Sequence, residues 1–227
     1  EIRYTTDGSE PNKNSTLYKD PIKLNNSSIL KAKSIKEGWL DSETNEVMFF
    51  KNDNYVIGYK VKSKTNDNYT ISHKVDFSFN GNESVLFDNK KGARVYKGTS
   101  IEDARTWMGF AKNDFVAEVK IRDSEKVNFI TLSMLENLDM KAIFPKRIEI
   151  YGKSNDRWIP INQLEIDLQD HPDDRKSYFK EFTLAVNLEG YNEVKIVAVN
   201  HFKFPKAPVY DRKRKYSWIF IDEVIFW

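Results

Sequence analysis

The chain opens with Ile2-Arg3-Tyr4-Thr5-Thr6-Asp7-Gly8-Ser9-Glu10-Pro11, a short apolar strand followed directly by a run of turn-forming residues. No start signal precedes the strand, so we interpret the chain as a piece of a longer protein. Further short strands and turns follow to about residue 51, with a reversal at Asn25-Asn26. The polar stretch Lys51-Asn52-Asp53-Asn54 marks a boundary. We therefore predict a first domain over 1–52 and a second over 53–227.

Strand signals are dense after the boundary, whereas no long stretch has helical periodicity. Phe115 to Ile121 alternates between apolar and polar residues, as expected of a half-buried strand. The regular spacing of such segments predicts an antiparallel β-sandwich. The predicted strands cover 55–62, 69–73, 115–121, 127–134, 146–152, 178–186, 192–200 and 217–227.

Composition excludes several classes of protein. With 40% hydrophobic and 14% aromatic residues, the chain can form packed cores and is not disordered. A net charge of +2 gives no reason to expect nucleic acid or an anionic membrane as partner. No apolar run approaches the length of a membrane span. The absence of cysteine excludes disulfides and thiolate chemistry.

No catalytic motif is present. The phosphate-binding, zinc-protease and serine-hydrolase patterns are missing, and three scattered histidines make a nucleophilic triad improbable. Asp222-Glu223 is an adjacent acidic pair, but strand alternation predicts that its two side chains point to opposite faces. We therefore expect no catalysis from this chain.

The first domain resembles the small fibronectin-like domain that follows the catalytic barrel in chitobiases and other β-hexosaminidases. The opening strand and its Asp-Gly-Ser-Glu-Pro turn carry this resemblance. Further matches follow in the same order at Thr16, Leu17-Tyr18, Pro21-Ile22 and Ile29 to Ala32.

The second domain resembles discoidin domains, also called coagulation factor 5/8 type C domains. In that family Gly usually stands at the position of Asn89, and Asn tolerates the left-handed conformation that such a turn requires. The matching segments are Leu86 to Gly92, Trp107 to Phe110, Phe115 to Ile121, Phe144 to Gly152 with Ser154 to Asp156, and Trp218 to Val224.

The order of the two domains resembles the C-terminal region of secreted bacterial β-hexosaminidases. This resemblance implies an all-β chain: a truncated fibronectin- or Ig-like sandwich, then a discoidin-like jelly roll. It implies a non-catalytic, carbohydrate-binding accessory module of a glycoside hydrolase, located in the periplasm, at the cell surface or outside the cell. Its partners would be an N-acetylhexosamine glycan and the parent enzyme's catalytic domain. The alternative is a structural domain that packs on the catalytic barrel and binds no glycan.

The segment from His201 to Tyr216 is the strongest candidate for ligand binding, because binding residues concentrate on loops of rigid scaffolds. Sugars present an apolar C–H face and a rim of hydroxyls, which aromatic rings and hydrogen-bonding groups match. His201, Phe204, Tyr210 and Arg212 supply these groups. The alternative is a solvated basic loop whose aromatic residues pack on a neighbouring domain.

Trp107 is a further candidate for the ligand-binding face, and a core position is the alternative. We expect Trp158 and Trp218 in the core. The segment 135–144 is expected to form a rim beside the basic loop.

Glu223 is a candidate metal ligand. Strand alternation places its carboxylate on one face with Ile219, Ile221 and Ile225, where an unpaired charge is costly. An ion pair, a strand end that reaches water, or a calcium ion with oxygen ligands would each compensate the charge. The resemblance to carbohydrate-binding discoidin domains implies that Asp88 and Glu223 hold a structural Ca²⁺.

Overall fold

The computed structural model describes residues 1–51, 55–63, 86–87, 107–137, 142–167, 178–202 and 217–227. The chain divides into two compact units, residues 1–53 with Trp227, and residues 54–226. Both units are built from β-strands, and the only helical element among the described residues is the 3₁₀ turn Ser124–Lys126. The prediction of an all-β protein is confirmed.

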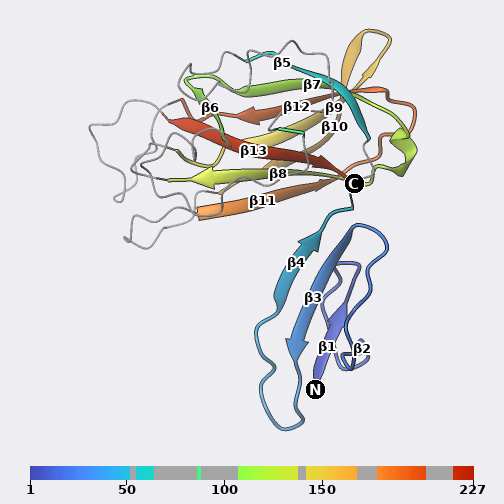
Figure 1. Ribbon diagram of the computed structural model, residues 1–227. Helices are drawn as coiled ribbons and strands as arrows, with labels where there is room; N and C mark the ends of the chain where they lie inside the picture. Colours follow the sequence, from blue (N-terminus) through green and yellow to red (C-terminus); the bar gives the residue numbers. More distant parts are fainter. Residues whose placement is uncertain (52–54, 64–85, 88–106, 138–141, 168–177, 203–216) are drawn as a thin grey trace. The chain divides into compact units, whose positions relative to one another are not determined.

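The first unit is a four-stranded antiparallel sheet in the order β2-β1-β3-β4 (Figure 1). The turn after β1 forms as the sequence predicts. Gly8 has a φ of +81°, which favours glycine, and Asp7 accepts hydrogen bonds from the amide and hydroxyl of Ser9. The strands are β1 (Ile2–Thr5), β2 (Thr16–Leu17), β3 (Ser28–Ser34) and β4 (Asn45–Phe49).

The second unit is a sandwich of two antiparallel sheets (Figure 1). One sheet has the order β10-β9-β12-β7-β5 and the other the order β11-β8-β13-β6. The strands are β5 (Val56–Val61), β6 (Met108–Ala111), β7 (Phe115–Ile121), β8 (Phe129–Glu136), β9 (Arg147–Ser154), β10 (Arg157–Glu165), β11 (Tyr178–Ala185), β12 (Glu193–Val199) and β13 (Trp218–Phe226).

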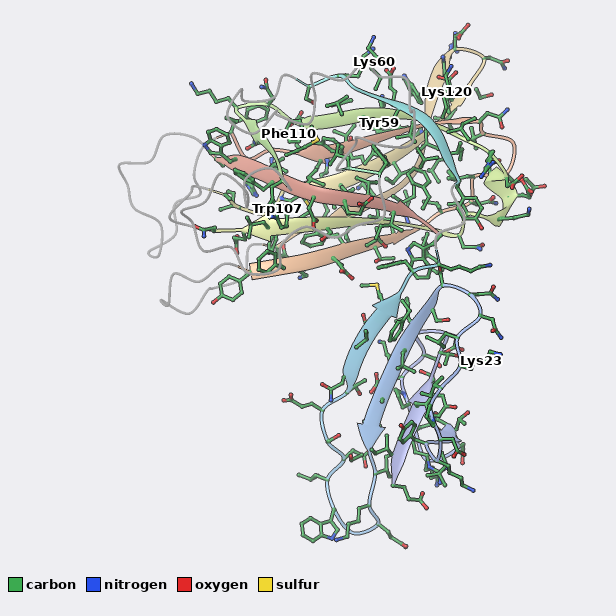
Figure 2. All side chains as sticks on the ribbon, in the orientation of Figure 1. Lys23, Tyr59, Lys60, Trp107, Phe110 and Lys120 are labelled. Carbon is green, nitrogen blue, oxygen red and sulfur yellow. The ribbon has the colours of Figure 1, made fainter. Side chains whose placement is uncertain are left out.

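Apolar side chains from both sheets form one core. Alternation determines which residues enter it: on β5, Tyr59 points into the sandwich and Lys60 away from it (Figure 2). The core therefore combines residues such as Ile150 and Ile196 of the five-stranded sheet with Leu132 and Ile221 of the four-stranded sheet.

Seven of the eight strands predicted for the second domain correspond to β5, β7, β8, β9, β11, β12 and β13. The eighth, over 69–73, lies outside the described residues. The sequence interpretation missed β6 and β10.

Candidate functional site

The candidate ligand-binding segment, residues 201–216 (the candidate loop), is held near each end by a hydrogen bond to one buried side-chain amide, that of Asn200. Asn200, which follows β12, is 2% exposed, and its side-chain oxygen accepts a hydrogen bond from the hydroxyl of Ser217 (2.5 Å) and from the amide of Phe202 (2.9 Å). Its side-chain nitrogen donates to the carbonyl of Asn113 (3.0 Å), and its backbone amide donates to the carboxylate of Asp114 (2.8 Å). One side chain thus joins the end of β12, the start of β13 and the turn between β6 and β7.

His201 is the first residue beyond this amide. The imidazole is half-buried, and its buried Nε2 has no hydrogen-bond partner among the described residues. Burial, with a smaller contribution from the charge of Lys146, lowers the pKa of His201. At neutral pH the ring is therefore uncharged and can offer a hydrogen bond rather than a cation. Phe204, Tyr210 and Arg212 lie outside the described residues.

Trp107 does not present its ring at the surface. It is 1% exposed and packs in a small cluster with Leu135, Ala142 and Phe220, and its ring lies 5.7 Å from that of Phe179. Figure 2 labels it beside the four-stranded sheet. Its contacts among the described residues are with this cluster and with Phe179, and none of them is with His201, so Trp107 holds a buried packing position.

The expected rim over 135–144 is wrong for its described members. Leu135, Glu136, Asn137 and residues 142–144 are all buried, at most 8% exposed. The reason is that β8 continues to Glu136 and the chain then pairs back on itself. Residues 138–141 lie outside the described part of the chain.

Glu223 lies on the opposite face of β13 from the one expected. The register places Ile221 opposite Met134 but Glu223 opposite Ser133, the next residue of β8, so Asp222 is the extra residue of a β-bulge. A bulge reverses the alternation. Ile219 and Ile221 therefore enter the main core with Val224 and Phe226, whereas Glu223 and Ile225 lie on the outer face of the sheet.

Both carboxylates of the acidic pair Asp222-Glu223 are fully buried. The backbone amide of Val224, next to Glu223, donates a 2.7 Å hydrogen bond to the carbonyl of Leu86. Leu86 precedes the second candidate ligand, Asp88, by two residues, and Asp88 itself lies outside the described residues. No group of three or more His, Asp or Glu residues with the geometry of a metal site occurs within the described ranges.

Glu136 lies within the segment expected to form the rim, and its carboxylate is buried. It is 0% exposed, and burial raises its pKa from 4.5 to about 7, while the amide of Phe144 and the charge of Lys180 oppose this rise. The strand pattern carries no signal of such burial, because a polar residue at a strand end usually faces water.

Trp158 lies on the outer face of the five-stranded sheet and not in the core. It stands on the edge strand β10, opposite Lys153. The ammonium group of Lys195 lies 5.1 Å from the ring of Trp158 and 4.3 Å from that of Tyr151. Trp158 and Tyr151 therefore make cation–π contacts with Lys195 on this outer face. Trp218 is half-buried and stacks on Phe220 at 5.8 Å, so it packs against the small cluster that contains Trp107 and not in the core between the two sheets.

Comparison with known proteins gives one family match. The family described as "Fn3 associated" matches residues 1–49. No curated protein matches the chain. Among the described residues, no helix has the length and apolar character that crossing a bilayer requires.

The solved structures that are similar to this chain include two carbohydrate-binding modules of glycoside hydrolases. One, described as GH31 CBM32-2 bound to GalNAc, has a TM-score of 0.39 and 10% identity over 74% of this chain and 96% of that one. The other is CBM32-3 of a family 31 glycoside hydrolase from Clostridium perfringens, with a TM-score of 0.28 and 13% identity over 61% of this chain and 86% of that one.

Proposed function

We propose that this chain is a non-catalytic, carbohydrate-binding accessory module of a secreted bacterial glycoside hydrolase. The observation that carries the proposal is the buried Asn200 amide, which fixes both ends of the candidate loop on a rigid sandwich. Buried hydrogen bonds at the base of a loop hold its two ends in fixed positions, and a binding loop requires such fixed ends. The module would raise the local concentration of substrate by tethering its enzyme.

The proposed ligand is a glycan that contains N-acetylhexosamine, bound by His201, Phe204, Tyr210 and Arg212. The aromatic rings would stack on the apolar faces of the sugars, and the imidazole and guanidinium would bind their hydroxyls. The lowered pKa of His201 supports its role as an uncharged hydrogen-bonding group. The hexosaminidase-like nature of the parent enzyme belongs to this proposal and rests on the sequence resemblance.

We include a structural calcium ion held by Asp88 and Glu223 in the proposal. Carboxylate oxygens are the ligands that Ca²⁺ prefers, and a fully buried Glu223 suits a charge compensated by a cation. The hydrogen bond between Val224 and Leu86 supports this pairing, because it links the two chain segments that carry the ligands. The ion would fasten the segment after residue 85 to β13.

The test is calorimetric titration of the full chain with N-acetylhexosamine oligosaccharides, after a glycan array has selected the probes. We expect binding that Phe204→Ala and Tyr210→Ala each weaken at least ~10-fold, which corresponds to about 1.4 kcal/mol. Trp39→Ala is the matched control, since Trp39 is an exposed aromatic residue (69%) in the first unit.

Absence of binding to every probe, together with aggregation of the chain unless a catalytic domain is present, would favour the structural alternative. Turnover of a chromogenic N-acetylhexosaminide by the purified chain would contradict the non-catalytic assignment.

A further inference from the structure

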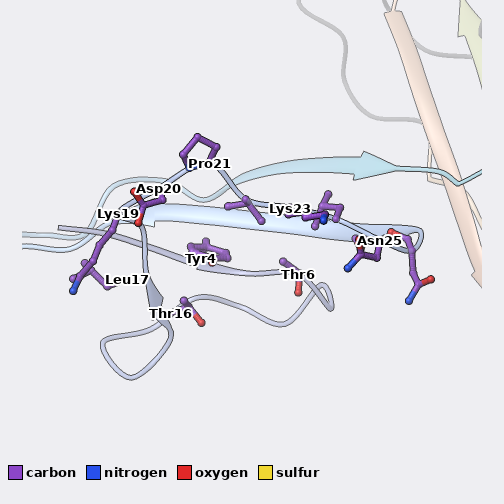
Figure 3. Close-up of a pocket in the computed structure, with 13 residues that line it drawn as sticks. Tyr4, Thr6, Thr16, Leu17, Lys19, Asp20, Pro21, Lys23 and Asn25 are labelled. Atoms are coloured by element: carbon purple, nitrogen blue, oxygen red, sulfur yellow. Dashed lines mark hydrogen bonds between the residues drawn. The ribbon is translucent and has the colours of Figure 1, made fainter.

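The first unit contains an open hollow on one face of its sheet (Figure 3). Its volume of about 600 Å³ lies within the range of ~300–1,000 Å³ that small-molecule sites occupy. Tyr4 of β1 and Thr16 of β2, which stand side by side in the register, line it from the sheet. The segment from Lys19 to Asn26 lines it from the other side.

Ser28, which lines the hollow, donates a hydrogen bond from its hydroxyl to the carbonyl of Asn26 (2.9 Å), whereas six other polar side chains of the lining have no partner in the part of the chain that the structure describes. Among the described residues, none makes a hydrogen bond or an ion pair with the side chains of Thr6, Thr16, Lys19, Asp20, Lys23 or Asn25. A hollow that combines six such side chains has hydrogen-bonding capacity to offer to a ligand.

The opposite face of the same sheet is different. There the charged side chains are paired within the protein: Lys31 with Glu46 (3.1 Å), Lys33 with Asp41 (3.3 Å) and Arg3 with Glu1 (2.6 Å). The charged groups of this face are therefore satisfied within the protein, whereas on the face of the hollow six polar side chains have no partner among the described residues.

An aromatic ring lies among these polar groups. Tyr4 is half-buried, and Tyr18, edge-on to it with ring centroids 6.4 Å apart, helps to fix its orientation. A ring held in place beside unpaired hydroxyl and amide groups matches a sugar, which has an apolar C–H face and a rim of hydroxyls.

Other ligand classes fit less well. An apolar small molecule requires a mostly apolar pocket, whereas this one is lined by hydroxyl, amide and charged groups. A phosphate-bearing ligand requires converging positive charge, whereas Asp20 lies beside Lys19 and Lys23. Short neutral groups and both signs of charge suit an uncharged polyhydroxylated ligand.

The geometry points to this hollow as a second carbohydrate subsite, in which Tyr4 stacks on one pyranose unit and Thr16 and Asn25 bind its hydroxyls. The inference deepens the proposed function, on which it rests, because it adds a contact of the same ligand class in the other unit. Two weak sites on one chain would bind a polysaccharide more tightly than either site alone.

The experiment is a two-dimensional amide NMR titration of the full chain with N,N′-diacetylchitobiose, N-acetylgalactosamine and lactose as separate probes. We expect at least one probe to cause saturable shifts of the amides of Tyr4, Thr16 and Asn25, with millimolar affinity. Tyr4→Ala should weaken this binding at least ~10-fold.

Thr16→Val is the second variant, because it removes only the hydroxyl and keeps a β-branched side chain suited to a strand. We expect it to weaken binding several-fold without disturbing the remaining spectrum. Trp39→Ala, in the same unit but outside the hollow, should leave the affinity unchanged.

The location of the shifts separates this inference from the proposed function. Shifts confined to residues near His201 and Trp218 would overturn the subsite and support the loop. Shifts confined to the hollow would support the subsite and contradict the loop assignment. Absence of saturable shifts with every probe would overturn both. An unchanged affinity of Thr16→Val and Tyr4→Ala, in variants that retain the wild-type spectrum, would also overturn the subsite.

Discussion

The hydroxyl of Ser217 donates a hydrogen bond of 2.5 Å to the side-chain oxygen of Asn200, and both residues are at most 2% exposed. The two residues are 17 positions apart and form the base of the candidate loop. Their contact makes the loop base a buried polar network, in which the loss of one member leaves the others unsatisfied.

We predict that Asn200→Ala lowers the free energy of unfolding by about 2–4 kcal/mol, because it leaves several buried polar groups without partners. Urea denaturation measures the change. Asn187→Ala is the control, since Asn187 is exposed and accepts one long hydrogen bond (3.2 Å), and its effect should stay within about 0.5 kcal/mol. Equal effects of the two substitutions would show that the amide network adds nothing.

Glu136 should make stability depend on pH. Its folded-state pKa of about 7 exceeds the ordinary 4.5, so between these values the unfolded chain loses a proton that the folded chain keeps. Stability therefore falls as the pH rises through this window, by up to roughly 3 kcal/mol. Glu136→Gln should match the wild type near pH 4.5 and be more stable at pH 8, as measured by urea denaturation.

The control for this pH effect is Glu189→Gln, which neutralises an exposed carboxylate in the same unit. Its stability should follow that of the wild type at both pH values. If Glu136→Gln does the same, Glu136 does not have a raised pKa.

Gly152 should not tolerate a side chain. A β-carbon at this position would lie 2.4 Å from the ring of Tyr191, well inside van der Waals contact. We predict that Gly152→Ala costs about 1–3 kcal/mol, as overpacking of a core does. Gly58→Ala is the matched control on the same sheet, because no atom of the described residues lies within 4 Å of its added carbon.

A double-mutant cycle identifies the cause of this cost. In the background of Tyr191→Ala, Gly152→Ala should cost less than in the wild type, because the clashing ring is gone. An unchanged cost would mean that the ring is not what excludes the side chain.

Calcium should stabilise the second unit if Glu223 is a ligand. At a concentration 100 times the dissociation constant, calcium would add about 2.7 kcal/mol and raise Tm by a few degrees relative to EDTA. Glu223→Gln should abolish the increment. Glu181→Gln should retain it; Glu181 is the control because it pairs with the same residue, Ser133, from the other neighbouring strand, β11. A Tm that is insensitive to calcium, or a shift that persists in Glu223→Gln, would contradict the metal site.

Local patterns predicted the strands that obey simple alternation. Phe115 to Ile121 buries every second residue, as its sequence indicates. β10 was missed because Pro160 and a bulge between Pro160 and Asn162 interrupt the pattern. β6 was missed because four residues with a glycine are too short to show a period.

The candidate site was predicted less completely, because its key features depend on partners distant in sequence. The alternation around Glu223 was misread, since a bulge exists only relative to the neighbouring strand β8. Asn200 is the last residue of a predicted strand. Its sequence context does not show whether its side-chain amide is buried and hydrogen-bonded or lies exposed in a turn. Trp107 is buried because it packs with Leu135 and Phe220 in a small apolar cluster, and neither residue is near it in the sequence.

The Asn200 amide also has a consequence for how this protein can change over generations. Because the chain is fastened at Phe202 and Ser217 by a residue outside the intervening segment, substitutions within that segment leave the fastening intact. If this segment binds a ligand as proposed, mutation and selection could vary its specificity at little cost to folding, because the residue that holds its two ends lies outside it.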